Sequence, residues 1–403
     1  MDDRKLVEDL YSITRPWFVS RITLSPDNLR LDAYLDHEEN CRWQCPVCSK
    51  EYCISDHVEE RIWRDLDSGI YQVYIHARIP RVNCIEHGKL QVTVPWSAKH
   101  SRFSMRFESL ALGIMRNMDI MNSSMIPGIT WNMAHGIMKR AVERGLARKS
   151  SVPERMGIDE KSYGKNHHYM TIIYDLDRSG ADHVEFNRKE SSLDLYYRSI
   201  GDKASCIKAV SMDMWDPYIA STKSHVNDAE SKIVFDRFHI MKHINSAVDD
   251  VRRSESRTAE AKDLLKRSRY IWTYSKENLP ERYRERFELL KKSDLKTARA
   301  YAIKENLRNL WQSSIEEEAR SFWNDWYMWA LHSRLAPVTR VAKMMKHYLY
   351  GILSFFKHHI TNAIAEGINS KIATVRKMAY GYRNKENLKT AIYFHCGNLD
   401  MGF

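Results

Sequence analysis

The chain lacks several features that would assign it to whole classes of protein. No apolar run approaches the roughly 18 residues that identify a transmembrane helix, so we expect no membrane span. The first residues are acidic and charged rather than basic and then apolar, which predicts that no secretory signal peptide is present. The seven cysteines are an odd number in a chain of 403 residues, which favours a reducing, cytoplasmic compartment over a framework of disulfides.

Glycine and proline are scarce over one long stretch. No glycine occurs between Gly201 and Gly351, and only Pro280 and Pro337 interrupt residues 236–361. Because these two residue types disfavour helix interiors, their scarcity predicts a helical segment of more than a hundred residues. Its tryptophans, such as Trp323 and Trp326, are more typical of a helical core than of base-stacking groups.

Positive charge is what the chain has in excess. The formal net charge is +11 and the isoelectric point is about 9.1. Such a balance favours nucleic acid or an anionic membrane surface as a partner, and it says nothing about the fold. The length allows two or three domains, each with its own core.

Two pairs of potential metal ligands share the same spacing. Two residues separate the ligands in Cys45-Pro-Val-Cys48 and in Cys84-Ile-Glu-His87, so both ligands of each pair can reach one tetrahedral ion. Thiolate and imidazole suit Zn²⁺, and four protein ligands leave no open position for catalysis. The sequence therefore predicts a structural zinc ion held by these four residues.

Alternatives to this ligand set remain open. Cys41 or His57 could replace one ligand, and a CxxC pair in a cytoplasmic protein can also be redox-active. Residues 71–84 and 89–96 alternate apolar and polar side chains, which predicts short strands next to the knuckles. Residues 1–40 are interpreted as a charged lead-in with short apolar patches.

Lys and Arg outnumber Asp and Glu in residues 99–150. The pattern predicts a helix over 101–118, then a short helix, a turn at Pro127-Gly128 and a longer helix starting near Thr130, which is the order of a helix-turn-helix. An ordinary helical hairpin with a solvated basic face is the alternative. The polar side of the last helix carries the residues that we expect to contact DNA, namely Asn132, His135, Lys139, Arg140 and Arg144.

Residues 150–240 change in character. Strands are predicted at 155–164, 168–176, 182–189, 206–214 and 231–239, with helices at 191–201 and 216–226. A meander of strands followed by strand–helix alternation predicts a mixed α/β sheet with helices packed on its faces. Asp159 and Asp213 are expected to close two of these strands, and if the strands are neighbours both carboxylates reach one edge.

Residues 361–384 repeat apolar side chains with a helical period, and Glu366 is their one acidic residue. Three clustered carboxylates can hold two Mg²⁺ ions about 3.5–4 Å apart, an arrangement that serves phosphodiester chemistry. Asp159, Asp213 and Glu366 are therefore candidate catalytic and Mg²⁺-binding residues, although each alone could be a turn cap or a surface ion pair. The cations that follow Glu366 are expected to hold DNA phosphates, and they are Lys371, Arg376, Lys377 and Arg383.

The blocks VSMDMWDPY, IVFDRFHI and TNAIAEGINSKIATVRKMAYGYRN resemble the DDE transposases of bacterial insertion sequences, in particular the ISL-three family with its N-terminal zinc-binding module. The resemblance covers most of the chain from Cys45 to Gly397. It implies that the family's two aspartates fall on Asp159 and Asp213 and its glutamate on Glu366. Asp236 and His239 resemble a D-x-x-H pair found near such sites, for which we expect a positioning role.

The resemblance also implies a multidomain α+β fold. Its expected parts are a small zinc-binding β module (1–98), a helix-turn-helix domain (99–150), and an RNase H-like mixed α/β catalytic domain (151–240 and 359–403) interrupted by an all-α insertion (241–358).

The activity implied is that of a DNA transposase. It would bind terminal inverted repeats, cleave the transposon ends and join the 3′-hydroxyls to target DNA, as a homodimer or larger assembly on the DNA in the bacterial cytoplasm and nucleoid. Two alternatives stay open: a non-catalytic DNA-binding regulator derived from a transposase, and a metal-dependent DNA nuclease without strand transfer.

Overall fold

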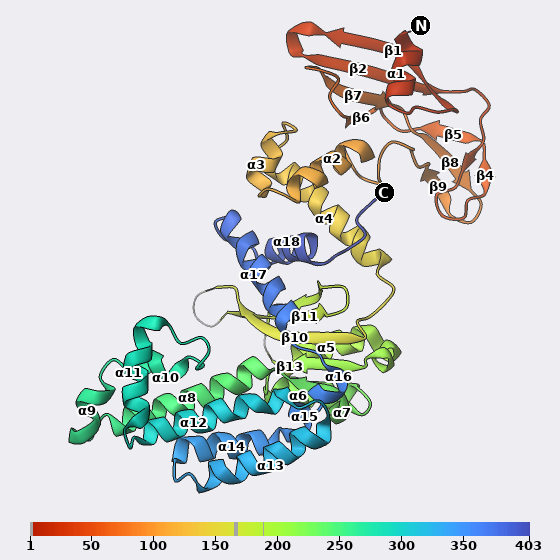
Figure 1. Ribbon diagram of the computed structural model, residues 1–403. Coiled ribbons are helices and arrows are strands. Elements are labelled where there is room, and N and C mark those ends of the chain that lie inside the picture. Colours follow the sequence, from red (N-terminus) through yellow and green to blue (C-terminus); the bar gives the residue numbers. More distant parts are fainter. Residues whose placement is uncertain (1–2, 165–167, 188) are drawn as a thin grey trace. The chain divides into compact units, whose positions relative to one another are not determined.

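The computed structural model describes residues 3–164, 168–187 and 189–403, which fold into two compact units (Figure 1). Unit 1 comprises residues Met1–Arg148 together with Asp400–Phe403, and unit 2 comprises Lys149–Leu399. Within the described residues, no helix is both long and apolar enough to cross a membrane. The finer division into five segments stays a prediction.

Residues 3–40 are folded, so the interpretation of a charged lead-in is wrong for them. Helix α1 (Asp3–Leu10) precedes a four-stranded sheet of order β1-β2-β7-β6, formed by β1 (Trp17–Ser25), β2 (Arg30–His37), β7 (Gln72–Ala77) and β6 (Arg61–Arg64). The apolar patches alternate with polar residues along β1, so that Trp17 and Val19 enter the core. Pairing with β2 then buries what looked like isolated patches.

Short strands carry the zinc knuckles. A three-stranded sheet is formed by β5 (Ile54–His57), β8 (Pro80–Cys84) and β9 (Gly88–Gln91), and a two-stranded one by β3 (Trp43–Gln44) and β4 (Glu51–Tyr52). The strands predicted within 71–84 and 89–96 are therefore present as β7, β8 and β9.

Three helices complete unit 1, and they are α2 (Met105–Met115), α3 (Ile120–Met125) and α4 (Trp131–Arg148). Ser104 and Asp119 cap the first two, because their side chains accept a backbone N–H in the first turn. The chain turns at Gly128, whose φ of +64° favours glycine. The predicted order of short helix, turn and longer helix is confirmed.

Unit 2 is built on a five-stranded sheet of order β12-β11-β10-β13-β14. Its strands are β10 (Arg155–Ser162), β11 (Tyr169–Asp175), β12 (Gly180–Glu185), β13 (Ala209–Met212) and β14 (Ile233–Phe235). The first three form an antiparallel meander, and β13 and β14 add in parallel beside β10. This is the predicted mixed sheet with β10 and β13 as neighbours; residue 188, in the expected third strand, lies outside the described residues.

The helices of the sheet domain are α5 (Glu190–Ile200), α6 (Asp216–His225), α7 (Ala229–Lys232), α17 (Ala363–Met378) and α18 (Lys385–Cys396). The predicted all-helical insertion lies between β14 and α17. Its members are α8 (Arg237–Glu255), α9 (Ala259–Leu265), α10 (Arg269–Thr273), α11 (Glu281–Lys292), α12 (Lys296–Leu307), α13 (Glu316–His332), α14 (Ala336–His347), α15 (Leu349–Leu353) and α16 (Phe355–His358).

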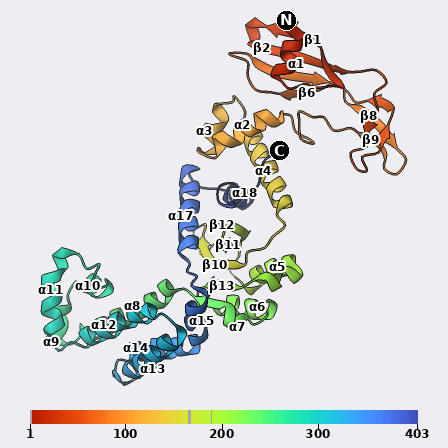
Figure 2. The same cartoon turned by 45° about the vertical axis from the view of Figure 1, so that its right-hand side comes forward.

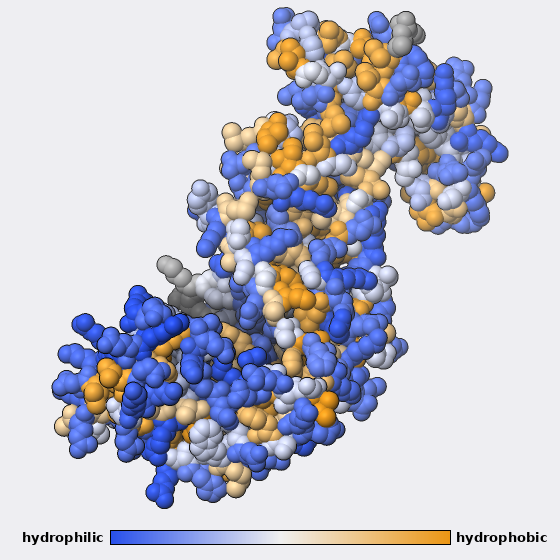
Figure 3. All heavy atoms as spheres, viewed as in Figure 1, coloured by the Kyte–Doolittle hydropathy of each residue, from blue (hydrophilic) through white to orange (hydrophobic). Residues whose placement is uncertain are grey.

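One apolar core runs from the sheet into the insertion, and it includes Met212, Phe235 and Ile240 as well as Trp323 and Trp326. Both tryptophans are buried, and the Trp326 Nε1–H donates to the carbonyl of Ile303 at 2.9 Å. They are core residues, as the composition favoured, and are closed to base stacking. The visible outer face of the inserted helices is largely hydrophilic (Figure 3).

Candidate active site and zinc centre

Cys45, Cys48, Cys84 and His87 converge in unit 1, with one ligand atom of each lying within 4.8 Å of the others. The Cys48 and Cys84 sulfurs are 3.7 Å apart, and the Cys84 sulfur lies 3.4 Å from Nδ1 of His87. A tetrahedral zinc ion with bonds of about 2.3 Å to sulfur and 2.0 Å to nitrogen places such pairs about 3.8 and 3.5 Å apart. The donor set and its spacing therefore fit a structural zinc ion.

The surroundings of Cys84 lower the pKa of its thiol. Burial would raise its pKa, but hydrogen bonds from the Tyr52 hydroxyl and His87 outweigh this and lower the pKa to about 6. A thiolate is the form that binds zinc, so these neighbours favour the ligating state.

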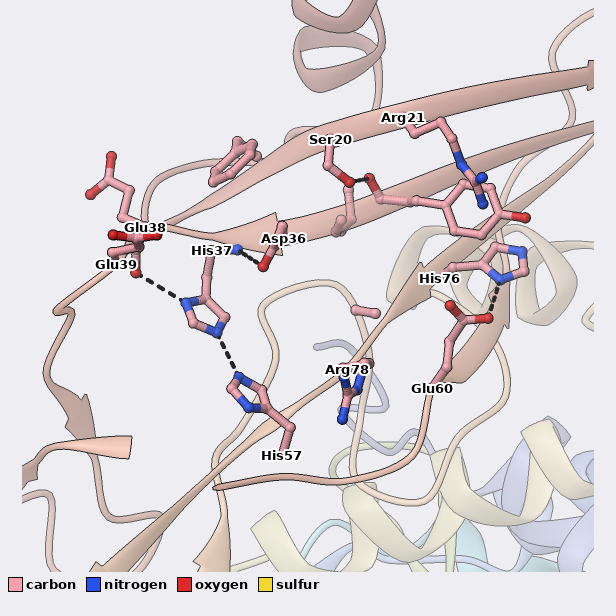
Figure 4. Close-up of a pocket in the computed structure, with 14 residues that line it drawn as sticks. Ser20, Arg21, Asp36, His37, Glu38, Glu39, His57, Glu60, His76 and Arg78 are labelled. Atoms are coloured by element: carbon pink, nitrogen blue, oxygen red, sulfur yellow. Dashed lines mark hydrogen bonds and ion pairs between the residues drawn. The ribbon is translucent and has the colours of Figure 1, made fainter. Parts of the chain in front are cut away.

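The alternative ligands lie elsewhere in unit 1. His57 Nε2 is 2.8 Å from Nε2 of His37, in a cavity beside β1 and β2 that is separate from the cysteines (Figure 4). The thiol of Cys41 faces the carboxylate of Glu38. The spacing of the two knuckles thus identified the ligands that come together.

Asp159 lies within β10 rather than at its end, which corrects the expectation from the sequence. The parallel pairing of β10 with β13 ends at Gly157, whereas its antiparallel pairing with β11 continues to Ser162. The pairing of β10 with β13 therefore stops before Asp159, although the strand continues. Burial raises the pKa of Asp159, and the charges of Glu160 and Asp213 act in the same direction.

Asp213 follows β13 directly. Its Oδ1 accepts the backbone N–H of Met214 at 2.6 Å, and its Oδ2 lies 2.9 Å from Nδ1 of His239. Burial alone would raise the pKa of Asp213, but the hydrogen bond and charge of His239 outweigh it and lower the pKa. The same hydrogen bond raises the pKa of His239, which favours an imidazolium–carboxylate pair.

Asp236 follows β14 and caps α8, where its Oδ1 accepts the N–H of Phe238 at 3.3 Å. The cap sets the start of α8 and places His239 one turn along the helix, facing Asp213. Burial raises the pKa of Asp236, and the charges of Glu366 and Asp213 add to the increase. The electrostatic field of Glu366, exposed in the first turn of α17, therefore reaches the same group of acids.

Asn369 joins α17 to the sheet, a role that was not predicted from the sequence. Its Nδ2 donates to Oδ2 of Asp159 at 2.8 Å, while its Oδ1 accepts the hydroxyl of buried Tyr174 at 2.9 Å. Asn369 follows Glu366 by three residues, so both lie on adjacent positions of one helix face. The spacing of Glu366 and Asn369 in the AEGIN block is therefore a sequence signal that predicts a place for Asn369 beside the site.

The close approach of α17 to β10 depends on Gly157. A Cβ at Gly157 would lie 3.1 Å from Leu176 and 3.3 Å from Oδ1 of Asn362, the residue before α17. The Oδ1 atom of Asn362 is buried and has no hydrogen-bond partner among the described residues. Burial disfavours the charged forms of Asp159 and Asp236, and Oδ1 of Asn362 lacks a donor. Such oxygens suit a hard divalent cation.

The carboxylates are less tightly grouped than the zinc ligands. In the part of the chain that the structure describes, the cysteine–histidine cluster is the one group of three or more potential ligands that all lie within 4.8 Å. The acids are instead linked in pairs. His239 is hydrogen-bonded to Asp213 and feels the charge of Asp236, and Asn369 holds Asp159 from α17. Charge repulsion further couples Asp159 to Asp213, and Asp236 to Asp213 and Glu366.

The polar face of α4 is only partly free. Lys139 and Asn132 are exposed, whereas Arg140 pairs with buried Glu108. Arg144 donates to the carbonyls of residues 401 and 402 and lies 4.0 Å from the ring centroid of Phe403. His135 stacks on Trp131 at 4.9 Å, and burial lowers its pKa.

The cations of α17 also divide into two kinds. Arg376 donates to the carbonyls of Ser162 and Tyr163 at 3.0 and 2.7 Å, so it fastens the end of β10. Lys371, Lys377 and Arg383 are exposed.

Unit 2 carries Asp159 and Asp213 on or directly after neighbouring strands of a mixed sheet, and unit 1 carries a Cys3His cluster. This combination is typical of nucleic-acid-processing enzymes. Comparison with known proteins makes this specific. Residues 156–392 match the family model described as "Transposase" for the DDE transposases of the ISL3 (ISL-three) type, and residues 42–87 match the "zinc-finger of transposase IS204/IS1001/IS1096/IS1165". The chain therefore belongs to the ISL3 transposase family, which confirms the resemblance.

Two relatives are similar along most of their length. The chain is 26% identical over 395 residues to the transposase for insertion sequence element IS1001 of Bordetella parapertussis, covering 96% of both chains. It is 27% identical over 357 residues to the transposase for insertion sequence element IS1557 of Mycobacterium tuberculosis, covering 81% of this chain and 80% of the relative. Membership of this family implies that the chain binds DNA.

Proposed function

We propose that the chain cleaves the ends of a DNA transposon and joins their 3′-hydroxyls to target DNA, with Asp159, Asp213 and Glu366 as its catalytic carboxylates. The observation that carries the proposal is the pair Asp213–His239, whose charges act on Asp159 where the pairing of β10 with β13 ends. Glu366 is exposed in the first turn of α17, and its charge contributes to the raised pKa of Asp236, which links it to these acids.

Asp159, Asp213 and Glu366 would hold two Mg²⁺ ions. When bound, such ions activate a water or a 3′-hydroxyl and neutralise charge on the attacking and leaving oxygens. Burial and neighbouring negative charge raise the pKa values of Asp159 and Asp236, and a bound cation would remove that penalty, which supports this assignment.

The other residues of the site position these acids. His239 holds one oxygen of Asp213, and Asn369 holds one oxygen of Asp159, so neither carboxylate rotates freely. Asp236 orients His239 by capping α8. These contacts matter because catalysis requires the acids to be placed relative to the reacting phosphate with a precision of a fraction of an ångström.

DNA recognition is assigned to both units. In unit 1, Lys139 and Asn132 on α4 are exposed, and the ion pair of Lys139 with Glu143 at 3.9 Å lies at the surface, so these side chains can contact a phosphate and a base edge. In unit 2, Lys371, Lys377 and Arg383 supply exposed positive charge beyond Glu366. Because two transposon ends react together, we propose a homodimer or larger assembly on the DNA.

The test is Asp213→Asn assayed on duplexes that carry the inverted repeats flanking the gene, with Mg²⁺ present. We expect end binding to persist and strand cleavage to fall by at least about a thousandfold, while Asp202→Asn, which changes an exposed acid of unit 2, cleaves normally. A regulator without catalysis would show no cleavage by the unmodified chain. A plain nuclease would cleave but would give no joined product from pre-cut ends and a target plasmid.

A further inference from the structure

The end of α17 holds an unusual residue in a left-handed conformation. Gly381 N–H donates to the carbonyl of Arg376 at 2.9 Å, and Tyr380 N–H donates to that of Lys377 at 3.0 Å, which together form a Schellman cap. The position that such a cap places at positive φ is usually glycine, and here it is Tyr380, with φ of +51°. The glycine comes one residue later.

The ring of Tyr380 is fully solvent-exposed, at 101% of the reference accessibility. It therefore adds no packing to the fold, although its backbone is in a region that disfavours a side chain. Non-glycine residues at positive φ cluster at active sites and ligand-binding sites. The feature points to a ligand outside the chain.

The surroundings of the ring identify the class of ligand. Lys377 and Arg383 flank the cap and are exposed, and in the described part of the chain no carboxylate forms an ion pair with either. Met378 is also 39% exposed beside them. An aromatic face between two free cations suits a polymer with both phosphates and open π-faces, which is a single-stranded or frayed nucleic acid.

We propose that Tyr380 stacks on an unpaired DNA base while Lys377 and Arg383 hold the adjoining phosphates. The inference rests on the proposed function, and it adds a contact between the chain and unpaired bases of the DNA substrate. Helix α17 leaves β10 and extends away from the inserted helices (Figures 1 and 2). From Glu366 to the cap, a rise of 1.5 Å per residue gives about 20 Å, which corresponds to about six nucleotides at the duplex rise of 3.4 Å and to fewer in an extended single strand.

The experiment compares a blunt inverted-repeat duplex with one that carries a single-stranded tail at the cleaved end. The tail holds 2-aminopurine at successive positions up to about six nucleotides from the cleavage position, and its fluorescence falls when the base stacks. Tyr380→Gly removes the ring and suits the positive φ, Tyr380→Phe keeps the ring, and Tyr270→Ala is a control at another exposed tyrosine.

We expect Tyr380→Gly to melt at the same or a higher temperature, to bind the tailed DNA roughly 5- to 100-fold more weakly, and to lose the quenching. Tyr380→Phe and the Tyr270 control should behave as the unmodified chain does, and the blunt duplex should bind all variants alike. Equal binding and quenching by Tyr380→Gly would overturn the inference, as would equal losses on both DNAs. A change in oligomeric state without DNA would also overturn it, by making the ring a protein contact.

These outcomes are separable from failure of the proposed function. If the unmodified chain cleaves and joins DNA while Tyr380→Gly binds tails normally, the stacking contact alone is wrong. If the unmodified chain binds both DNAs but never cleaves, the catalytic proposal is wrong, whatever the quenching shows.

Discussion

Replacing Asn369 by alanine tests whether α17 holds the active site through its side-chain contacts with the sheet. The change removes the donor to Asp159 at 2.8 Å and the acceptor of the Tyr174 hydroxyl at 2.9 Å. Tyr174 is 0% exposed, so its hydroxyl is left buried without a partner. Such a group costs about 1–3 kcal/mol, and a lost hydrogen bond to a charged group about as much.

We expect Asn369→Ala to lower the free energy of unfolding of unit 2 by about 3 kcal/mol, since the two losses are not fully additive. In a unit of this size that corresponds to a fall in melting temperature of about 6–12 °C. Cleavage should fall by about 10- to 100-fold because Asp159 loses its orientation.

Tyr174→Phe separates the two effects. It keeps the hydrogen bond to Asp159, so cleavage should stay within a few-fold of the unmodified rate. In the double variant no hydroxyl is stranded, and its loss of stability should be smaller than the sum of the single losses by about 1–2 kcal/mol.

Melting curves and single-turnover cleavage rates at saturating DNA measure both quantities, with Ser370→Ala as the control. Ser370 is the exposed neighbour of Asn369 on α17, and its hydroxyl donates to the carbonyl of Glu366. Cleavage by Asn369→Ala at the unmodified rate would refute the positioning argument. Strict additivity of the stability losses would refute the bridge itself.

Two further predictions concern unit 1. The zinc content of the purified chain should be one ion per chain and should fall to none in Cys84→Ser, with a lower melting temperature; a full zinc content in that variant would contradict the ligand set. Arg140→Ala should lower the free energy of unfolding by about 3 kcal/mol, because Glu108 remains buried without its ion-pair partner. Lys139→Ala should leave the melting temperature unchanged and reduce the salt dependence of DNA binding by about one ion. Destabilisation by Lys139→Ala but not by Arg140→Ala would contradict these roles.

The sequence predicted those features that depend on local spacing. Two CxxC-like knuckles fixed the four zinc ligands, and strand–helix alternation predicted the mixed sheet in which β10 and β13 are neighbours. Periodicity also predicted the helix that carries Glu366. In each case a short pattern determines the geometry without reference to distant residues.

Features that depend on distant partners were not predictable in this way. Arg140 and Arg144 lie on the polar side of α4, but one pairs with Glu108 and the other with the C-terminal carbonyls, and no spacing within α4 reveals this. Asp159 looked like the end of a strand because its neighbours become polar, although β11 continues to pair beyond it. Asn369 acquires its role from Tyr174, on another strand.

The inserted helices raise a related question, because more than a hundred residues separate Asp236 from Glu366. Both ends of the insertion are fastened to β14, the strand that precedes Asp236. Helix α8 continues from that strand, and α15 returns to it so closely that a Cβ at Gly351 would lie 2.5 Å from the ring of Phe235. The spatial relation between the two acids therefore depends on the short segments beside β14. The length of the insertion between those two attachments has little influence on it, which is why a mixed sheet can accept so large a helical segment next to its acids.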